Sequence, residues 1–167
     1  MKKLIALTIV LILLMTLFVG CKPKVSVSEA VNRLRSNGFV SSASYVDPKE
    51  LEVFTSFTND EIKRMGGSFK IKIVERHYFA SSIDSSHSCT LIVFATANQA
   101  RKYANCKAID FAKRREESGY LNSGDFGGYW GNPLPNETFK WKVAHSGRLV
   151  VISNCDIAMD AIDLNFR

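Results

Sequence analysis

The chain has 167 residues, of which 46% are hydrophobic, and a formal net charge of +6. This length is enough for a single domain to bury a core without the help of metals or disulfides. The basic residues are spread along the chain, apart from the run Lys113-Arg114-Arg115, and together with the export signal described next this excludes nucleic acid as a predicted partner.

The first 21 residues have the three-part layout of a secretory leader. Lys2 and Lys3 form a basic start, an apolar run extends from Leu4 to Val19, and Gly20 stands before Cys21. The apolar run is shorter than the roughly 18 residues that a membrane-spanning helix needs. We therefore predict a cleaved leader and not a transmembrane anchor.

The end of this leader, Leu17-Phe18-Val19-Gly20-Cys21, resembles the lipobox of bacterial lipoproteins, although leucine is usual where Phe18 stands. The resemblance implies that residues 1–20 are removed as a signal peptide and that Cys21 carries a diacylglyceryl group. Two acyl chains anchor a protein stably, so the membrane is a predicted partner. Residues 21–25 are then a lipidated tether, and the protein lies on the extracytoplasmic face of the cell membrane or outer membrane.

Helix signals dominate the first part of the mature chain. A capping-box pattern at Ser26 predicts a helix from about Val27 to Asn37. Residues 39–46 form a weak strand candidate. Start signals at Asp47 and Thr58 then predict two short helical pieces, and the first of them is expected to turn its apolar side chains inward, namely Leu51, Phe54 and Phe57.

Two strands and a long helix follow. Phe69 to Phe79 alternates between apolar and charged residues, as a strand with one buried face does. Cys89 to Ala95 is apolar throughout, which predicts a central strand covered on both faces. These two strands are expected to pair as a hairpin. Thr96 then starts a helix that should end near Ser118, with a buried stripe formed by Ala97, Ala100, Tyr103, Ala104, Ala108 and Phe111.

The C-terminal part predicts a second hairpin and a closing helix. Phe139 to His145 and Leu149 to Ser153 are the two strands, joined by a turn at Gly147. Asp156 to Asn165 is the helix, with a predicted buried face formed by Ile157, Ala161 and Leu164. Hairpin-connected strands separated by helices favour an α+β fold. We expect residues 26–167 to form one globular domain, with an antiparallel sheet of about four to five strands and helices packed mainly on one face.

The segment 120–137 is the longest stretch without a helix or strand pattern. It places three aromatic residues, Phe126, Tyr129 and Trp130, among several glycines and prolines. Long loops in compact domains are often functional, and such rings could contact a ligand or partner. The alternative is that they fold back over the sheet as a small apolar cluster.

No motif predicts a catalytic, metal or cofactor site. His87 and Cys89 lie close in sequence, but two ligands fall short of the three or four that zinc requires. A disulfide among Cys89, Cys106 and Cys155 is compatible with export, and the sequence does not choose the pair. The leading hypothesis is a non-enzymatic envelope lipoprotein that binds an envelope protein or a cell-wall component. The alternative is a small hydrolase or thiol/redox enzyme that uses the His87/Cys89 region.

Overall fold

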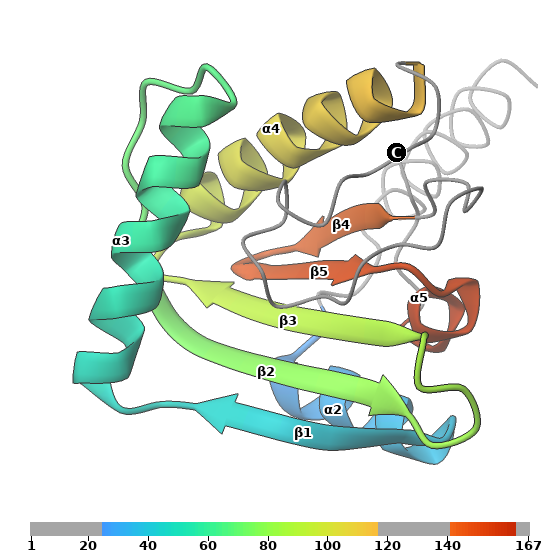
Figure 1. The fold of residues 1–167 in the computed structure, drawn as a ribbon. Coiled ribbons are helices and arrows are strands. Elements are labelled where there is room, and N and C mark those ends of the chain that lie inside the picture. The colour runs from blue at the N-terminus through green and yellow to red at the C-terminus, as the bar shows by residue number, and fades with distance from the viewer. Residues whose placement is uncertain (1–24, 117–140, 163–167) are drawn as a thin grey trace, which may run out of the picture.

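The computed structural model describes residues 25–116 and 141–162 of the chain. They form four helices and five strands (Figure 1). In chain order these are α2 (Val27–Ser36), β1 (Phe39–Tyr45), α3 (Pro48–Arg64), β2 (Ile73–Ser81), β3 (Ser88–Phe94), α4 (Ala97–Glu116), β4 (Lys142–Ser146), β5 (Leu149–Ser153) and α5 (Asp156–Ile162).

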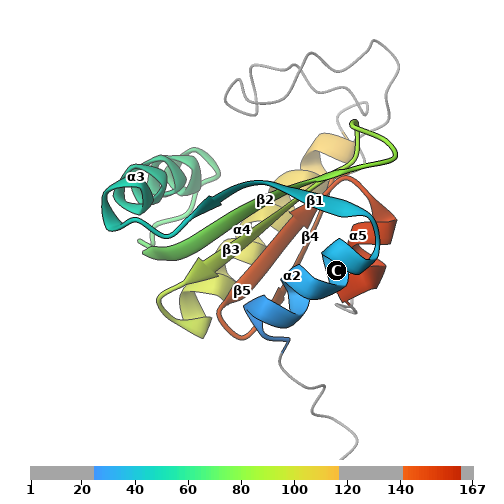
Figure 2. The ribbon, with the colours of Figure 1, turned by 90° about the horizontal axis from the view of Figure 1, so that it is seen from below.

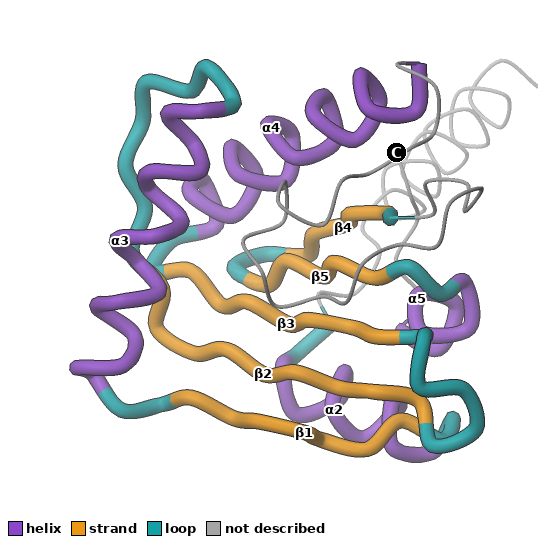
Figure 3. The backbone as a smooth tube through the Cα atoms, in the orientation of Figure 1, coloured by secondary structure: helices purple, strands orange, loops and turns teal. Residues whose placement is uncertain are grey.

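The five strands form one antiparallel sheet with the order β1-β2-β3-β5-β4. The predicted α+β fold and both predicted hairpins, β2 with β3 and β4 with β5, are confirmed. A short turn joins the strands of the second hairpin (Figure 3), and Gly147 lies in it with a φ of 56°, which suits a residue without a side chain. Strand β1 is one edge of the sheet.

Residues 48–64 form one continuous helix, so the expected division into two pieces is wrong. Asp47 caps this helix by accepting hydrogen bonds from the backbone N–H groups of Lys49 and Glu50. Thr58 does not start a second helix, because its side chain is buried inside α3. In a continuous helix the buried face passes through Leu51, Thr58 and Ile62, which turns Phe57 toward solvent.

Strand β2 begins at Ile73, four residues later than the alternating pattern predicted. The reason is a side chain of α3. Asn59 donates to the backbone C=O of Ile71 and accepts from its N–H, at 3.2 and 2.8 Å. The hydrogen bonds that a neighbouring strand would supply are therefore made by a helix, and regular pairing starts two residues further on.

The helices cover both faces of the sheet, which corrects the expectation that they lie mainly on one (Figure 2). Alternate residues of β3 belong to two separate cores. Leu91 and Val93 pack with α2 and α5, whereas Ile92 and Phe94 pack with α3 and α4. Every residue of β3 and β5 is buried, as predicted for β3. A two-faced core follows from such fully apolar strands.

Helix α4 buries most of its predicted stripe, while α5 is rotated from its predicted position. Ala97 is exposed, but the other α4 residues of the stripe are buried or partly buried. In α5 the buried residues are Ala158, Met159 and Ile162, and Ile157 is exposed. The buried Cys155 continues this face at helical spacing, which is why the helix rests on the 158/159/162 side.

Candidate functional site

Most of the site residues predicted from the sequence lie outside the described part of the chain. Cys21 precedes residue 25, and Phe126, Tyr129 and Trp130 fall between residues 117 and 140. Their predicted roles in lipidation and ligand contact therefore stay predictions. Of the predicted candidates, only the His87/Cys89 region has a described geometry.

Cys89 has the environment of a core residue and not of a reactive thiol. Its side chain is completely buried in β3, where it packs in the same apolar core as Cys155. Burial, with a smaller contribution from the neighbouring Cys155, raises the pKa of the Cys89 thiol far above its ordinary value. Because the thiolate is the nucleophilic form, this environment suppresses the chemistry that the enzyme alternative requires. Cys89, Cys106 and Cys155 are all free thiols.

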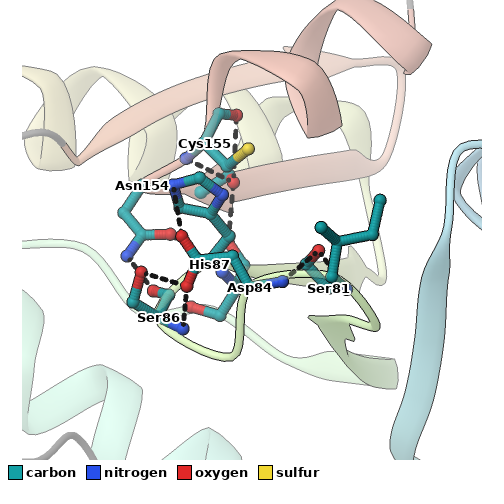
Figure 4. Close-up of polar contacts among 9 residues, drawn as sticks. Ser81, Asp84, Ser86, His87, Asn154 and Cys155 are labelled. Carbon is teal, nitrogen blue, oxygen red and sulfur yellow. Dashed lines mark hydrogen bonds and ion pairs between the residues drawn. The ribbon is translucent and has the colours of Figure 1, made fainter.

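His87 belongs to a polar network that ties the β2–β3 loop to the start of α5 (Figure 4). Its backbone N–H donates to the C=O of Asp84, and its ring lies 3.6 Å from the Asp84 carboxylate. Asn154 closes the network by donating to the Ser86 C=O at 2.7 Å and accepting from the Ser88 N–H at 2.8 Å. These contacts position a loop, and they give His87 a structural role.

A cluster that the sequence did not predict lies where β1, β2 and α3 meet. We call it the arginine cluster, and it consists of Tyr45, Phe54, Arg76 and Tyr78. The Arg76 guanidinium lies over the rings of Phe54 and Tyr78, 4.5 and 4.7 Å from their centroids. The Tyr45 ring packs edge-on against both rings, at 4.7 and 6.0 Å. Cation–π contacts with two rings hold the guanidinium in place.

The charge of Arg76 is not neutralised by the carboxylates around it. No side-chain hydrogen bond or ion pair engages Arg76 in the described residues, and its Nε is buried without a partner. Glu75, the preceding residue, accepts from His77 at 2.7 Å. Glu61 of α3 is bound by Tyr103 and Lys107 of α4, at 2.9 and 2.6 Å. Among residues 25–116 and 141–162, the arginine cluster therefore holds a fixed cation without a paired carboxylate.

Glu61 forms a polar group with Tyr103 and Lys107 of α4, and the two α4 side chains of this group are buried. The Lys107 side chain is only 6% exposed, and its Nζ lies 5.0 Å from the centroid of the Phe111 ring. Burial, and then the negative charge of Glu61, raise the pKa of Tyr103 well above its ordinary value. The sequence offered one signal for this group, because Tyr103, Lys107 and Phe111 share one helical face at four-residue spacing.

A second group missed by the sequence lies on β1 and the opposite face of β2. Ser44 and His77 are cross-strand partners, and the serine Oγ lies 2.7 Å from His77 Nδ1. The other ring nitrogen, Nε2, lies 2.7 Å from the Glu75 carboxylate. Serine, histidine and carboxylate thus form a continuous hydrogen-bonded chain. Ser44 is the exposed member, and the His77 side chain is 12% exposed.

Neither a metal site nor a membrane span is found in the part of the chain that the structure describes. Residues 25–116 and 141–162 hold no group of three or more His, Cys, Asp or Glu side chains placed to bind a metal ion. Every helix within those residues is too short or too polar to cross a bilayer. Comparisons with known protein families, with curated proteins and with solved structures found no match to this chain.

Proposed function

We propose that this protein is a lipid-anchored lipoprotein of the cell envelope whose domain binds a partner protein or a cell-wall component without catalysing a reaction. The leader supports the proposed location in the cell envelope, because its short apolar run ends at Gly20-Cys21. Lipidation of Cys21 would hold the domain next to the membrane surface through a short tether. Phe126, Tyr129 and Trp130 remain proposed contact residues.

The described residues offer a second contact region around α3. Three large apolar side chains are exposed within 12 residues of sequence: Val46 at 65%, Val53 at 53% and Phe57 at 64%. We call them the α3 surface. They flank Tyr45 and Phe54 of the arginine cluster in sequence. Exposed apolar side chains that adjoin a fixed cation are typical of a protein-binding surface, where aromatic and arginine side chains supply most of the affinity.

The α3 surface predicts where a partner is captured. In cells that make the full-length protein, a photo-crosslinking phenylalanine analogue at Phe57 should give a discrete covalent adduct with an envelope component. The matched control is the same analogue at Ile157, which is 57% exposed but lies on α5, across the sheet from α3. We expect no adduct from position 157. Equal labelling at both positions, or none at position 57, would contradict binding through the α3 surface.

A second candidate function, a serine hydrolase, is favoured by the chain of Ser44, His77 and Glu75. In such enzymes histidine takes the serine proton during attack on a carbonyl carbon, and a carboxylate orients the histidine. This candidate predicts that a fluorophosphonate probe labels the wild-type protein and the Ser42→Ala control, but not Ser44→Ala. If the wild-type protein is not labelled, the three residues act only as a clamp between β1 and β2.

A further inference from the structure

We propose that Arg76 binds the carboxylate of a peptide segment, an inference that rests on the binding function proposed above and names the chemistry of the ligand. The guanidinium already lies over the rings of Phe54 and Tyr78. Binding therefore costs little additional ordering of the arginine side chain. The side chain is half-buried, and the nitrogen that lies buried without a partner is Nε. An incoming carboxylate would use the two terminal nitrogens.

The local charge balance favours a ligand with a single negative charge. Glu61 is paired with Lys107 and Glu75 with His77, so within the described part of the chain Arg76 contributes one positive charge that no carboxylate matches. A carboxylate brings one negative charge, whereas a phosphate monoester brings about 1.5 to 2 at neutral pH. The planar fork of a guanidinium also matches the two oxygens of a carboxylate. A carboxylate therefore fits this site better than a phosphate.

The surroundings of Arg76 favour a carboxylate that belongs to a peptide with an apolar side chain. Tyr45 and Phe54 provide aromatic faces within the arginine cluster, and their immediate neighbours in sequence are Val46 and Val53 of the α3 surface. Tyr45 also ends β1, which among the strands that the structure describes pairs with β2 alone and leaves its other edge open. An extended peptide laid along this open edge could form backbone hydrogen bonds there while its carboxylate contacts Arg76.

The test follows the Nε–H resonance of Arg76 in the nitrogen–proton spectrum of the full-length protein in detergent micelles. The Arg76→Lys variant assigns this resonance by its loss. The probe is N-acetylphenylalanine, which carries a carboxylate next to an aromatic side chain, and the matched ligand is its neutral carboxamide. We expect the acid to shift the Arg76 resonance in a saturable way and the amide to leave it unchanged. The titration itself uses the wild-type protein, and the Arg76→Lys variant serves there only to assign the resonance.

Variants then separate charge from geometry. Arg76→Lys keeps the charge but loses the planar fork and its stacking, and should weaken binding of the acid about tenfold. Arg33→Lys is the control, because Arg33 already pairs with Glu29 at 2.5 Å and should bind no ligand. Equal binding of acid and amide, unchanged affinity in Arg76→Lys, or tighter binding of phenyl phosphate than of the acid would each overturn the inference. A crosslink at Phe57 without binding of the acid would leave the proposed function standing and remove only this inference.

Discussion

Glu61→Gln is expected to lower the free energy of unfolding by about 2–3 kcal/mol. The substitution keeps the shape of the side chain but removes the charge that Lys107 contacts at 2.6 Å. Lys107 is almost fully buried, so its ammonium group would stay in the core after losing its contact with the Glu61 carboxylate. Glu61 itself is 32% exposed, so the expected loss is smaller than the roughly 3–5 kcal/mol that breaking a fully buried ion pair costs. The loss is measured by urea unfolding of the unlipidated Cys21→Ser protein, compared with the same protein that also carries Glu61→Gln.

The reverse substitution provides the control. Lys107→Met removes the buried charge and fills its volume with an apolar side chain, while Glu61 keeps its contact with Tyr103 and its access to water. We expect a loss of no more than about 1 kcal/mol, because replacing a buried charge with an apolar side chain is often nearly neutral. If Glu61→Gln and Lys107→Met lower the free energy of unfolding equally, the burial of the Lys107 charge is not the cause of the loss in Glu61→Gln.

Cys21→Ser is expected to abolish lipid attachment. Serine lacks the sulfur that the diacylglyceryl group would modify, so metabolic labelling with a radioactive fatty acid should fall to background. The protein should then either leave the membrane fraction or accumulate as an unprocessed precursor. Each buried methylene contributes about 0.8 kcal/mol to anchoring, so losing two acyl chains removes most of the membrane affinity.

Cys106→Ser separates this effect from a general loss of a thiol. Cys106 lies on α4, where burial, and then Asp110, raise the pKa of its thiol. The Cys106→Ser variant should keep both the fatty-acid label and the membrane location of the wild-type protein. If Cys21→Ser keeps the fatty-acid label, the lipid is attached to another residue, which would contradict Cys21 as the lipidation site.

Local patterns predicted the secondary structure well where capping and periodicity agreed. The Ser26 cap, the Asp47 cap and the turn at Gly147 each lie where expected, since each depends on a few neighbouring residues. The errors have tertiary causes. Strand β2 starts four residues later than predicted because Asn59 hydrogen-bonds with the backbone of Ile71. These two residues are 12 positions apart in sequence.

The placement of helices on two faces follows from the composition of β3. A strand that is apolar throughout, such as β3, must be covered on both sides, and this excludes helices on one face alone. The rotation of α5 could not be predicted in the same way. It has apolar residues on two faces, one through Ile157 and the other through Met159, and packing against α2 selects the Met159 face.

The candidate sites depended even more on tertiary structure. Arg76 looks like an ordinary charged residue of an alternating strand, and only the approach of Phe54 from α3 gives it a second ring. Likewise, Ser44 and His77 are 33 residues apart and meet through strand pairing. For Cys89 the sequence suggested a candidate site that the structure does not support. Its proximity to His87 in sequence suggested chemistry, whereas its position in a fully buried strand disfavours it.

The most direct test of the central claim is the mass of the N-terminal fragment of the wild-type protein extracted from membranes. We predict a chain that begins at Cys21 and carries a diacylglyceryl group on its sulfur. A mature protein that retains residues 1–20, or that begins elsewhere with Cys21 absent or unmodified, would contradict it.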